Sequence, residues 1–166
     1  QTVWFAVALG FLYLTLKPRS DRPFWELLGW REPRAEPGRT SRASLYLLCA
    51  LGGAVLAIAI SYASQFFMPK QALPIQAFFQ DQQSVILMGV MGILVAPLVE
   101  ETIFRGFLYP AFARSLGIAG GIALTGLAFG LMHAQQLWGG WVQIALLVLV
   151  GVVFTLARAR AGSVIP

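Results

Sequence analysis

The sequence is poor in charge, cysteine and histidine, and each shortage narrows the classes of protein to which it can belong. Only 11% of its 166 residues are charged, against 58% that are hydrophobic. An ordinary soluble domain carries about 25% charged residues, so this class is excluded. The single cysteine, Cys49, has no partner for an intrachain disulfide. The single histidine, His133, excludes the HExxH zinc motif, which requires two.

Long hydrophobic runs are what the sequence has instead. A membrane-spanning helix needs about 20 mostly apolar residues. The runs predict an all-α, multi-pass transmembrane helix bundle with five to six spans. Five are expected at residues 1–16, 43–68, 84–112, 117–134 and 141–157, and a sixth starts near Gly162. Because the chain opens on Gln1 and not on methionine, we expect it to begin part-way through a longer protein or after a removed signal peptide.

Positive charge gathers in one polar loop. Residues 17–42 hold seven basic and four acidic residues. Since cytoplasmic loops of membrane proteins carry an excess of Lys and Arg, this loop is predicted to be cytoplasmic in a cell-membrane protein. The connections 69–83 and 135–140 hold a single basic residue and are predicted to share the opposite side. The net charge of +5 therefore indicates topology and membrane lipid as a partner, with no nucleic acid.

Within that loop, the stretch FWELLGW at residues 24–30 fits two structures. One is a short interfacial helix whose apolar side chains, among them Leu28 and Trp30, face lipid. The other is a solvated loop with aromatic anchors.

Four ionisable residues fall inside the predicted spans: Glu100, Glu101, Arg105 and His133. Such residues are costly in the bilayer, so they normally face a partner or a wet cavity and indicate function. The alternative is that they pair only to hold two helices together.

Helix geometry gives the two glutamates different surroundings. Residues four apart share a helix face, so Glu101 and Arg105 are predicted to form an ion pair. Glu100 lies about 100° away and lacks that partner. Pro97 removes one backbone donor and is expected to bend the helix where a cavity would open. Phe104, one turn beyond Glu100, is placed to line the same pocket.

His133 lies at a matching depth on the next span. Counting about 1.5 Å per residue from the shared turn places Glu100 at about 22 Å and His133 at about 27 Å. The two are therefore expected to meet across a tight helix pair. Small residues would allow the close approach: Gly117, Ala119, Gly120, Gly121, Gly126 and Gly130. A carboxylate beside an imidazole in a low-dielectric pocket is suited to activating water.

The stretches EETIFRG, residues 100–106, and FGLMH, residues 129–133, resemble the EExxxR and FxxxH motifs of the CPBP intramembrane proteases, which include the CAAX prenyl protease 2 type. The resemblance implies a multi-pass all-α endopeptidase that cleaves peptide bonds in or beside the membrane. It implies catalytic roles for Glu100, which activates water, for His133, and for the supporting pair Glu101 and Arg105. It divides the chain into N-terminal spans, 1–83, and a protease core, 84–166.

The resemblance leaves two questions undecided: whether the site uses a metal, and which later residues complete it. Family members have been discussed both as metalloproteases and as glutamate proteases, and one histidine with two carboxylates makes a poor zinc site. Members also carry an HxxxN motif on a later helix, but this sequence has no asparagine. That motif is expected about one turn beyond Pro166, so the core is expected to be incomplete in this chain.

Three functions remain open from the sequence. The first is endopeptidase action on CAAX-type or other membrane-protein substrates, with a peptide or membrane protein as partner. The second is a catalytically inactive subunit or scaffold of a membrane complex, in which the charged cluster only locks helices. The third is an ion or proton transporter with Glu100 as relay, because lone intramembrane carboxylates also serve that purpose.

Overall fold

The computed structural model describes residues 2–33, 41–69 and 71–165, and it is helical throughout, with no strand among these residues. Residues 34–40 of the polar loop, Gln1, and Pro166 with the motif expected after it lie outside the described residues. The elements are α1 (Thr2–Leu16), η1 (Lys17–Arg19), α2 (Phe24–Leu27), α3 (Arg42–Phe66), η2 (Pro74–Phe78), α4 (Gln82–Val90), η3 (Met91–Val95), α5 (Ala96–Glu100), η4 (Glu101–Leu108), α6 (Tyr109–Met132) and α7 (Trp141–Ala161). The predicted all-α membrane fold is confirmed.

Three helical runs in the described residues are long and apolar enough to cross a membrane: Arg42–Phe66, Gln82–Met132 and Trp141–Ala161. The middle run reverses at Gly117, whose φ of 74° is a left-handed conformation that glycine adopts at little cost. It therefore supplies two spans, as predicted from the sequence. Helix α1 has 15 residues, about 22 Å, which is shorter than the hydrocarbon core. The sixth span expected near Gly162 does not begin within the described residues, because Gly162 ends α7 in a left-handed cap.

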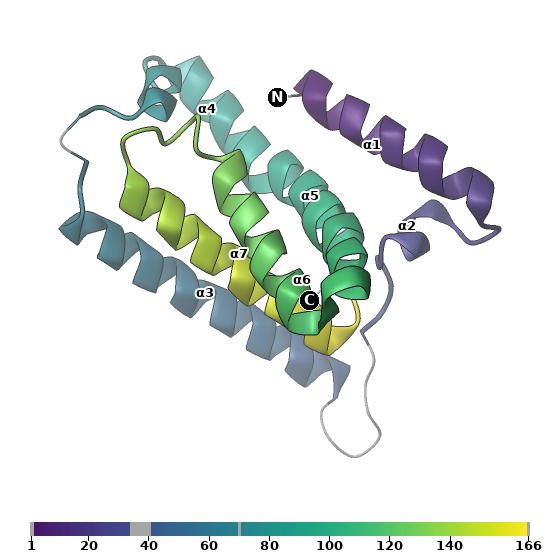
Figure 1. Ribbon diagram of the computed structural model, residues 1–166. Helices are drawn as coiled ribbons and strands as arrows, with labels where there is room; N and C mark the ends of the chain where they lie inside the picture. The colour runs from purple at the N-terminus through teal and green to yellow at the C-terminus, as the bar shows by residue number, and fades with distance from the viewer. Residues whose placement is uncertain (1, 34–40, 70, 166) are drawn as a thin grey trace.

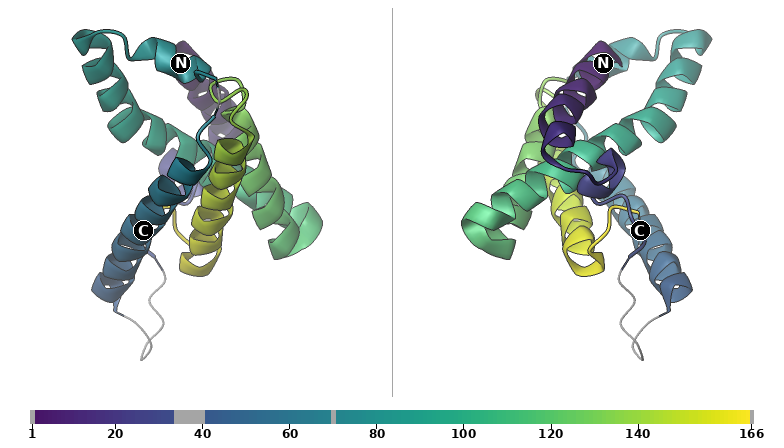
Figure 2. Two further views of the ribbon diagram at one scale, coloured as in Figure 1. Left: turned by 90° about the vertical axis from the view of Figure 1, so that its left-hand side faces the viewer. Right: turned by 90° about the vertical axis from the view of Figure 1, so that its right-hand side faces the viewer.

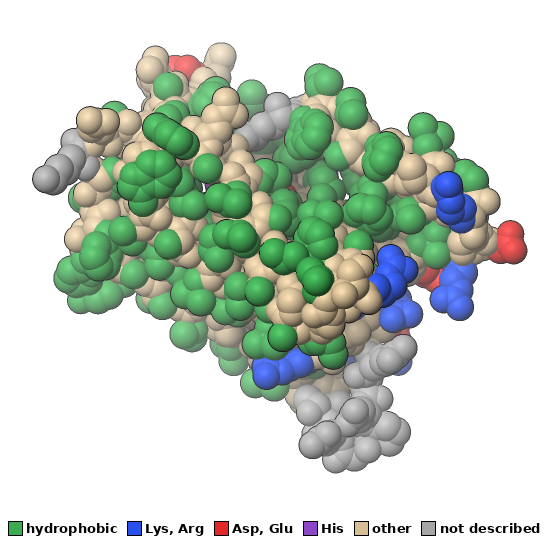
Figure 3. Space-filling view, in the orientation of Figure 1, with side chains coloured by type: hydrophobic (Ala, Val, Ile, Leu, Met, Phe, Trp, Pro, Cys, Tyr) green, Lys and Arg blue, Asp and Glu red, His purple; other side chains and the backbone are tan. Residues whose placement is uncertain are grey.

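Helix α7 packs against both α3 and α6, and η4 packs against α6 and α7 (Figure 1). Most large apolar side chains point outward, and the described part of α3 has no buried residue. The space-filling view shows this apolar surface across one face of the molecule (Figure 3). An apolar exterior on every side of a helix is what lipid requires.

The two connections predicted to share one side of the membrane contact each other. The backbone N–H of Ile75 donates to the carbonyl of Gln136 at 3.0 Å. The side chain of Gln143 donates to the carbonyl of Phe67 at 2.7 Å, joining the end of α3 to the start of α7. The side views show these ends together, opposite the end where α7 finishes (Figure 2).

Glycines bring α6 and α7 into backbone contact. A Cβ on Gly126 would lie 2.9 Å from the backbone nitrogen of Val152, and one on Gly151 would lie 2.9 Å from the Cα of Gly126. Gly121, in contrast, packs against Ala113 across the turn at Gly117. Gly126 and Gly130 were expected to serve the pairing of the third and fourth spans, and this was wrong for both residues. Their nearest neighbours belong to α7.

Gly126→Ala should therefore destabilise the protein by about 1–3 kcal/mol, because the added methyl meets backbone and forces the two helices apart. Gly53→Ala is the matched control, since a Cβ there meets nothing within 4 Å. The control should leave stability unchanged or raise it by up to about 1 kcal/mol. Unfolding of both variants in detergent micelles measures the difference. Equal effects would show that α6 and α7 do not pack through this glycine.

Candidate active site

The helix that carries the charged motif is wound irregularly on both sides of Pro97. The five residues of η3 and the eight of η4 form π-helical turns, with α5 between them. The N–H of Ala96 donates to Met91, and that of Tyr109 donates to Phe104, both five residues back. Proline has no N–H to continue an α-helical ladder, which explains the first interruption. The backbone ladder is thus interrupted beside Pro97, and the bend and cavity expected there stay a prediction. Turns of the π type are frequent at functional sites.

The predicted ion pair between Glu101 and Arg105 is present. Arg105 Nη1 lies 3.1 Å from Glu101 Oε1. The arginine side chain is completely buried, whereas that of Glu101 is 25% exposed. The positive charge of a guanidinium without access to solvent must be balanced by neighbouring groups. The carboxylate of Glu101 serves as the counter-charge of Arg105.

Aromatic rings enclose the rest of the guanidinium. Arg105 Cζ lies 4.5 Å from the ring centroid of Phe129, 5.4 Å from Phe154 and 6.0 Å from Phe104. Distances up to about 6 Å allow the ring faces to attract the cation. Arg105 Nη2 also donates to the carbonyl of Gly151 at 3.4 Å. Arginine, phenyl rings and carboxylate thus form one packed unit that joins η4, α6 and α7.

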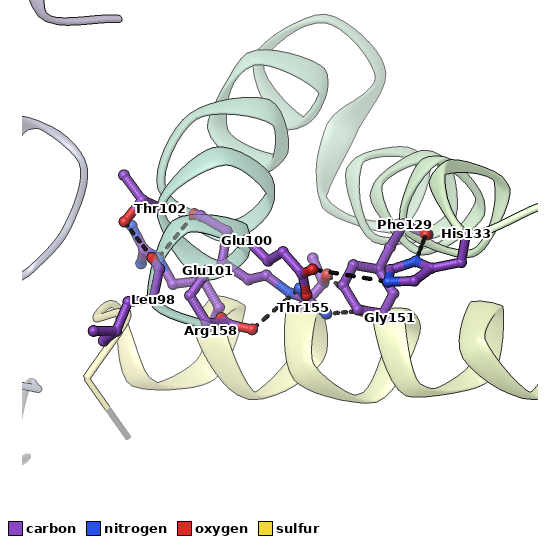
Figure 4. Close-up of polar contacts among 10 residues, drawn as sticks. Leu98, Glu100, Glu101, Thr102, Phe129, His133, Gly151, Thr155 and Arg158 are labelled. Carbon is purple, nitrogen blue, oxygen red and sulfur yellow. Dashed lines mark hydrogen bonds and ion pairs between the residues drawn. The ribbon is translucent and has the colours of Figure 1, made fainter. Parts of the chain in front are cut away.

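Glu100 turns away from this unit and toward the histidine, as predicted (Figure 4). Glu100 Oε1 lies 3.8 Å from His133 Nε2, and each side chain is 17% exposed. His133 follows the last residue of α6 as its C-cap. The side chains of Glu100, at the end of α5, and His133, at the end of α6, therefore lie close together and remain partly accessible.

The other ring nitrogen fixes the orientation of His133. Nδ1 lies 2.9 Å from the carbonyl oxygen of Phe129. Since a carbonyl can only accept a hydrogen bond, Nδ1 carries the proton, and the Nε2 of a neutral imidazole presents a lone pair toward Glu100. The ring also packs on Phe129, with centroids 5.0 Å apart. The geometry predicted for the four site residues is confirmed, while their catalytic roles stay a prediction.

From the sequence alone, Phe154 and Gly151 had no predicted role, and Phe129 was named only as part of the FxxxH motif. Phe129 contacts both Arg105 and His133, and its position four residues before His133 was the available signal. Phe104 was expected to line the pocket of Glu100, and it packs edge-on against Phe129 with centroids 5.3 Å apart. Phe154 and Gly151 come from α7, and neither carries a sequence signal of its role.

The described residues do not fit a zinc site. Among them, no three histidine, cysteine, aspartate or glutamate side chains come together in a way that could hold a metal ion. Glu100 and His133 supply two ligands, and zinc in proteins normally takes at least three. We therefore assign no metal to these residues and derive no step through one.

Comparison with known proteins places this geometry in a family. The family model for type II CAAX prenyl endopeptidase Rce1-like proteins matches residues 82–166, just over half of the chain. The chain belongs to the Rce1-like family. The match covers α4 to α7 and contains both motifs, so the resemblance drawn from them is confirmed.

This Rce1-like chain is also similar to an uncharacterized 24.3 kDa protein of Escherichia coli, with 33% identity over 118 residues. The aligned part covers 66% of this chain and 54% of the relative, so the chain spans about half the length of that curated protein. No solved structure matches the chain.

Proposed function

We propose that this Rce1-like protein is a membrane-embedded endopeptidase in which Glu100 activates water for attack on a peptide bond. The observation that carries the proposal is the meeting of Glu100 and His133 at 3.8 Å, with both side chains partly accessible. Two acceptor atoms at this separation accommodate one water molecule at about 2.8 Å from each. The chain belongs to a family described as type II CAAX prenyl endopeptidases, which supports peptide-bond hydrolysis as the reaction.

The proposed step follows from the tautomer of the histidine. The bound water donates one hydrogen to Glu100 and the other to His133 Nε2, which leaves its lone pairs free to attack the scissile carbonyl. Glu100 takes a proton as the carbon–oxygen bond forms. The protonated carboxyl then gives that proton to the leaving amine as the carbon–nitrogen bond breaks, which restores the carboxylate. Glu101 and Arg105 take no proton in this scheme and hold the helix in place.

The proposed substrate is a CAAX-type prenylated peptide or another membrane protein, hydrolysed by a core at residues 84–166. The partly exposed position of Glu100 and His133 in an apolar molecule supports a substrate that reaches the site through lipid. We propose the cell membrane as location with loop 17–42 in the cytoplasm, which the contacts between the two opposite connections support. A farnesylated CAAX peptide is therefore the first probe to use.

His133→Ala should reduce cleavage of a farnesylated CAAX peptide by about 10²–10³-fold, because the water loses one of its two orienting partners. The assay uses the full-length protein in proteoliposomes, with the released tripeptide quantified by mass spectrometry. Met132→Ala, the neighbouring lipid-exposed residue, is the control and should keep wild-type activity. Unchanged cleavage by His133→Ala would contradict the mechanism. Absence of cleavage by the wild-type protein on CAAX and other membrane peptides would favour the inactive scaffold.

A further inference from the structure

A short segment of the polar loop, Leu28–Pro33, packs against the protein through Leu28, Gly29 and Pro33, while Arg31 and Glu32 are exposed. Leu28 is 1% exposed, and Pro33 is fully buried. The segment follows the single-turn helix α2 and passes between η4 and the end of α7. The short helix expected in FWELLGW is present as α2, with Trp25 exposed, but Leu28, which was expected to face lipid, is buried, and Trp30 is half-buried. We call Leu28–Pro33 the clasp.

One side of the clasp is tied to the residues that follow α7. The N–H of Val164 donates to the carbonyl of Gly29 at 2.9 Å, and Arg31 Nε donates to the carbonyl of Gly162 at 3.2 Å. The hydroxyl of Ser163 donates to the carbonyl of Arg31. These contacts join parts of the chain about 130 residues apart and hold the clasp at a fixed position against α7.

The other side of the clasp contacts η4 directly. The carbonyl oxygen of Leu28 would lie 2.7 Å from a Cβ on Gly106, so the absence of a side chain at Gly106 is what allows the approach. About one helical turn before Gly106, Thr102 Oγ1 accepts a hydrogen bond from Trp30 Nε1 at 3.0 Å. Thr102 is 1% exposed and is the residue directly after Glu101.

The Thr102 hydroxyl links this contact to the π-turn. A hydroxyl has one hydrogen, and Thr102 donates it to the carbonyl of Leu98 at 2.7 Å. The Trp30 N–H occupies the acceptor side of the same oxygen, so the hydroxyl is held in that orientation. Leu98 lies in α5, two residues before its end, and Thr102 lies in η4, so this bond crosses the junction of the two elements. A side chain that bonds a carbonyl four residues back can bend a helix.

We propose that the clasp is a positioning element of the active site, in which Trp30 acts through Thr102 to hold the π-turn that carries Glu101 and Arg105. The catalytic consequence rests on the proposed endopeptidase function, whereas the structural one does not. Trp30 touches no reacting group in this scheme. It sets the direction in which the side chains of Glu100 and Glu101 project from the helix. A small misplacement of a catalytic group lowers the reaction rate more than it lowers substrate affinity.

Trp30→Phe tests the proposal, because it removes the N–H and keeps an aromatic ring. Amide hydrogen exchange in residues 101–108 should become about three- to tenfold faster, as expected for the loss of one hydrogen bond. With a CAAX peptide, kcat should fall about tenfold and KM should change less than twofold. Thr102→Val should reproduce both effects, and Thr102→Ser, which retains the hydroxyl, should retain wild-type behaviour.

Two comparisons make the result specific. Trp25→Phe changes an exposed tryptophan that packs edge-on against Trp30, with ring centroids 6.5 Å apart. It keeps an aromatic ring and the bond from Trp30 to Thr102, so it should alter neither exchange nor kcat. The double variant Trp30→Phe with Thr102→Val should be no worse than Thr102→Val alone, because that change already removes the bond that Trp30→Phe removes. Unchanged exchange in 101–108 for Trp30→Phe, or additive effects in the double variant, would overturn the proposal. Exchange needs no substrate, so faster exchange in a protein without peptidase activity would uphold the clasp and reject the proposed function.

Discussion

Glu100→Gln should reduce peptide cleavage by about a thousandfold while leaving the protein folded. The amide keeps the size of the carboxylate and its place 3.8 Å from His133, but it cannot take the proton of the attacking water. The measurement is tripeptide release from a farnesylated CAAX peptide in proteoliposomes. Because substrate binding does not require that proton transfer, the loss should fall on kcat, and the variant should still retain substrate.

Glu101→Gln is the matched variant for this experiment, since it makes the same chemical change one residue away. It removes a charge that is 3.1 Å from the buried guanidinium of Arg105 and takes no part in the proposed step. We expect it to lower stability and to keep measurable cleavage. The reverse outcome, in which Glu101→Gln abolishes cleavage with its fold intact and Glu100→Gln does not, would show that the two carboxylates have been assigned the wrong roles.

Arg105→Leu should lower the free energy of unfolding by about 3–5 kcal/mol, because it leaves the carboxylate of Glu101 without its partner. The leucine also gives up the attraction between the guanidinium and the rings of Phe104, Phe129 and Phe154. Unfolding in detergent micelles measures the change. Arg105→Lys should recover only part of the lost stability. An ammonium lacks the planar guanidinium that fits between the phenyl rings and the carboxylate of Glu101.

The controls for Arg105 separate local charge pairing from general loss of arginine. Arg114 is exposed on α6, and Arg114→Leu should change stability by no more than about 0.5 kcal/mol. Removing both partners, with Arg105→Leu and Glu101→Leu together, should be less damaging than Arg105→Leu alone, because no buried charge is then left unpaired. A double variant as unstable as the sum of its parts would show that the ion pair is not what holds this region.

Much of the site was predictable because it depends on local spacing. The interval of four between Glu101 and Arg105 indicated their ion pair, and counting residues from the turn near Ser115 brought Glu100 and His133 to within about one helical turn in depth. Both predictions rest on the geometry of a helical hairpin, which is contiguous in sequence. Composition was sufficient for the fold class, because no soluble structure could hide so many apolar side chains.

What could not be predicted depends on contacts between distant segments. Leu28 and Trp30 have the composition of a membrane-interface segment, and only the presence of Gly106 and Thr102 beside them turns them inward. Gly126 belongs to a pattern of small residues that allows any helix to approach closely. Nothing in the sequence indicates that α7 is the helix that does so. The π-turn of η4 was also missed, because no pattern in the local sequence indicates it and its contact with Trp30 joins segments 72 residues apart.

The two sets of contacts around the site imply an order of folding. Glu100 and His133 belong to one hairpin, so their meeting closes a short loop and can occur as soon as that hairpin enters the membrane. The clasp differs, because Gly29 needs the N–H of Val164 and Arg31 needs the carbonyl of Gly162. During synthesis from the N-terminus, residues 28–33 therefore cannot form these hydrogen bonds until α7 is complete. We expect the charged pair to assemble first and the clasp to close over the finished bundle last.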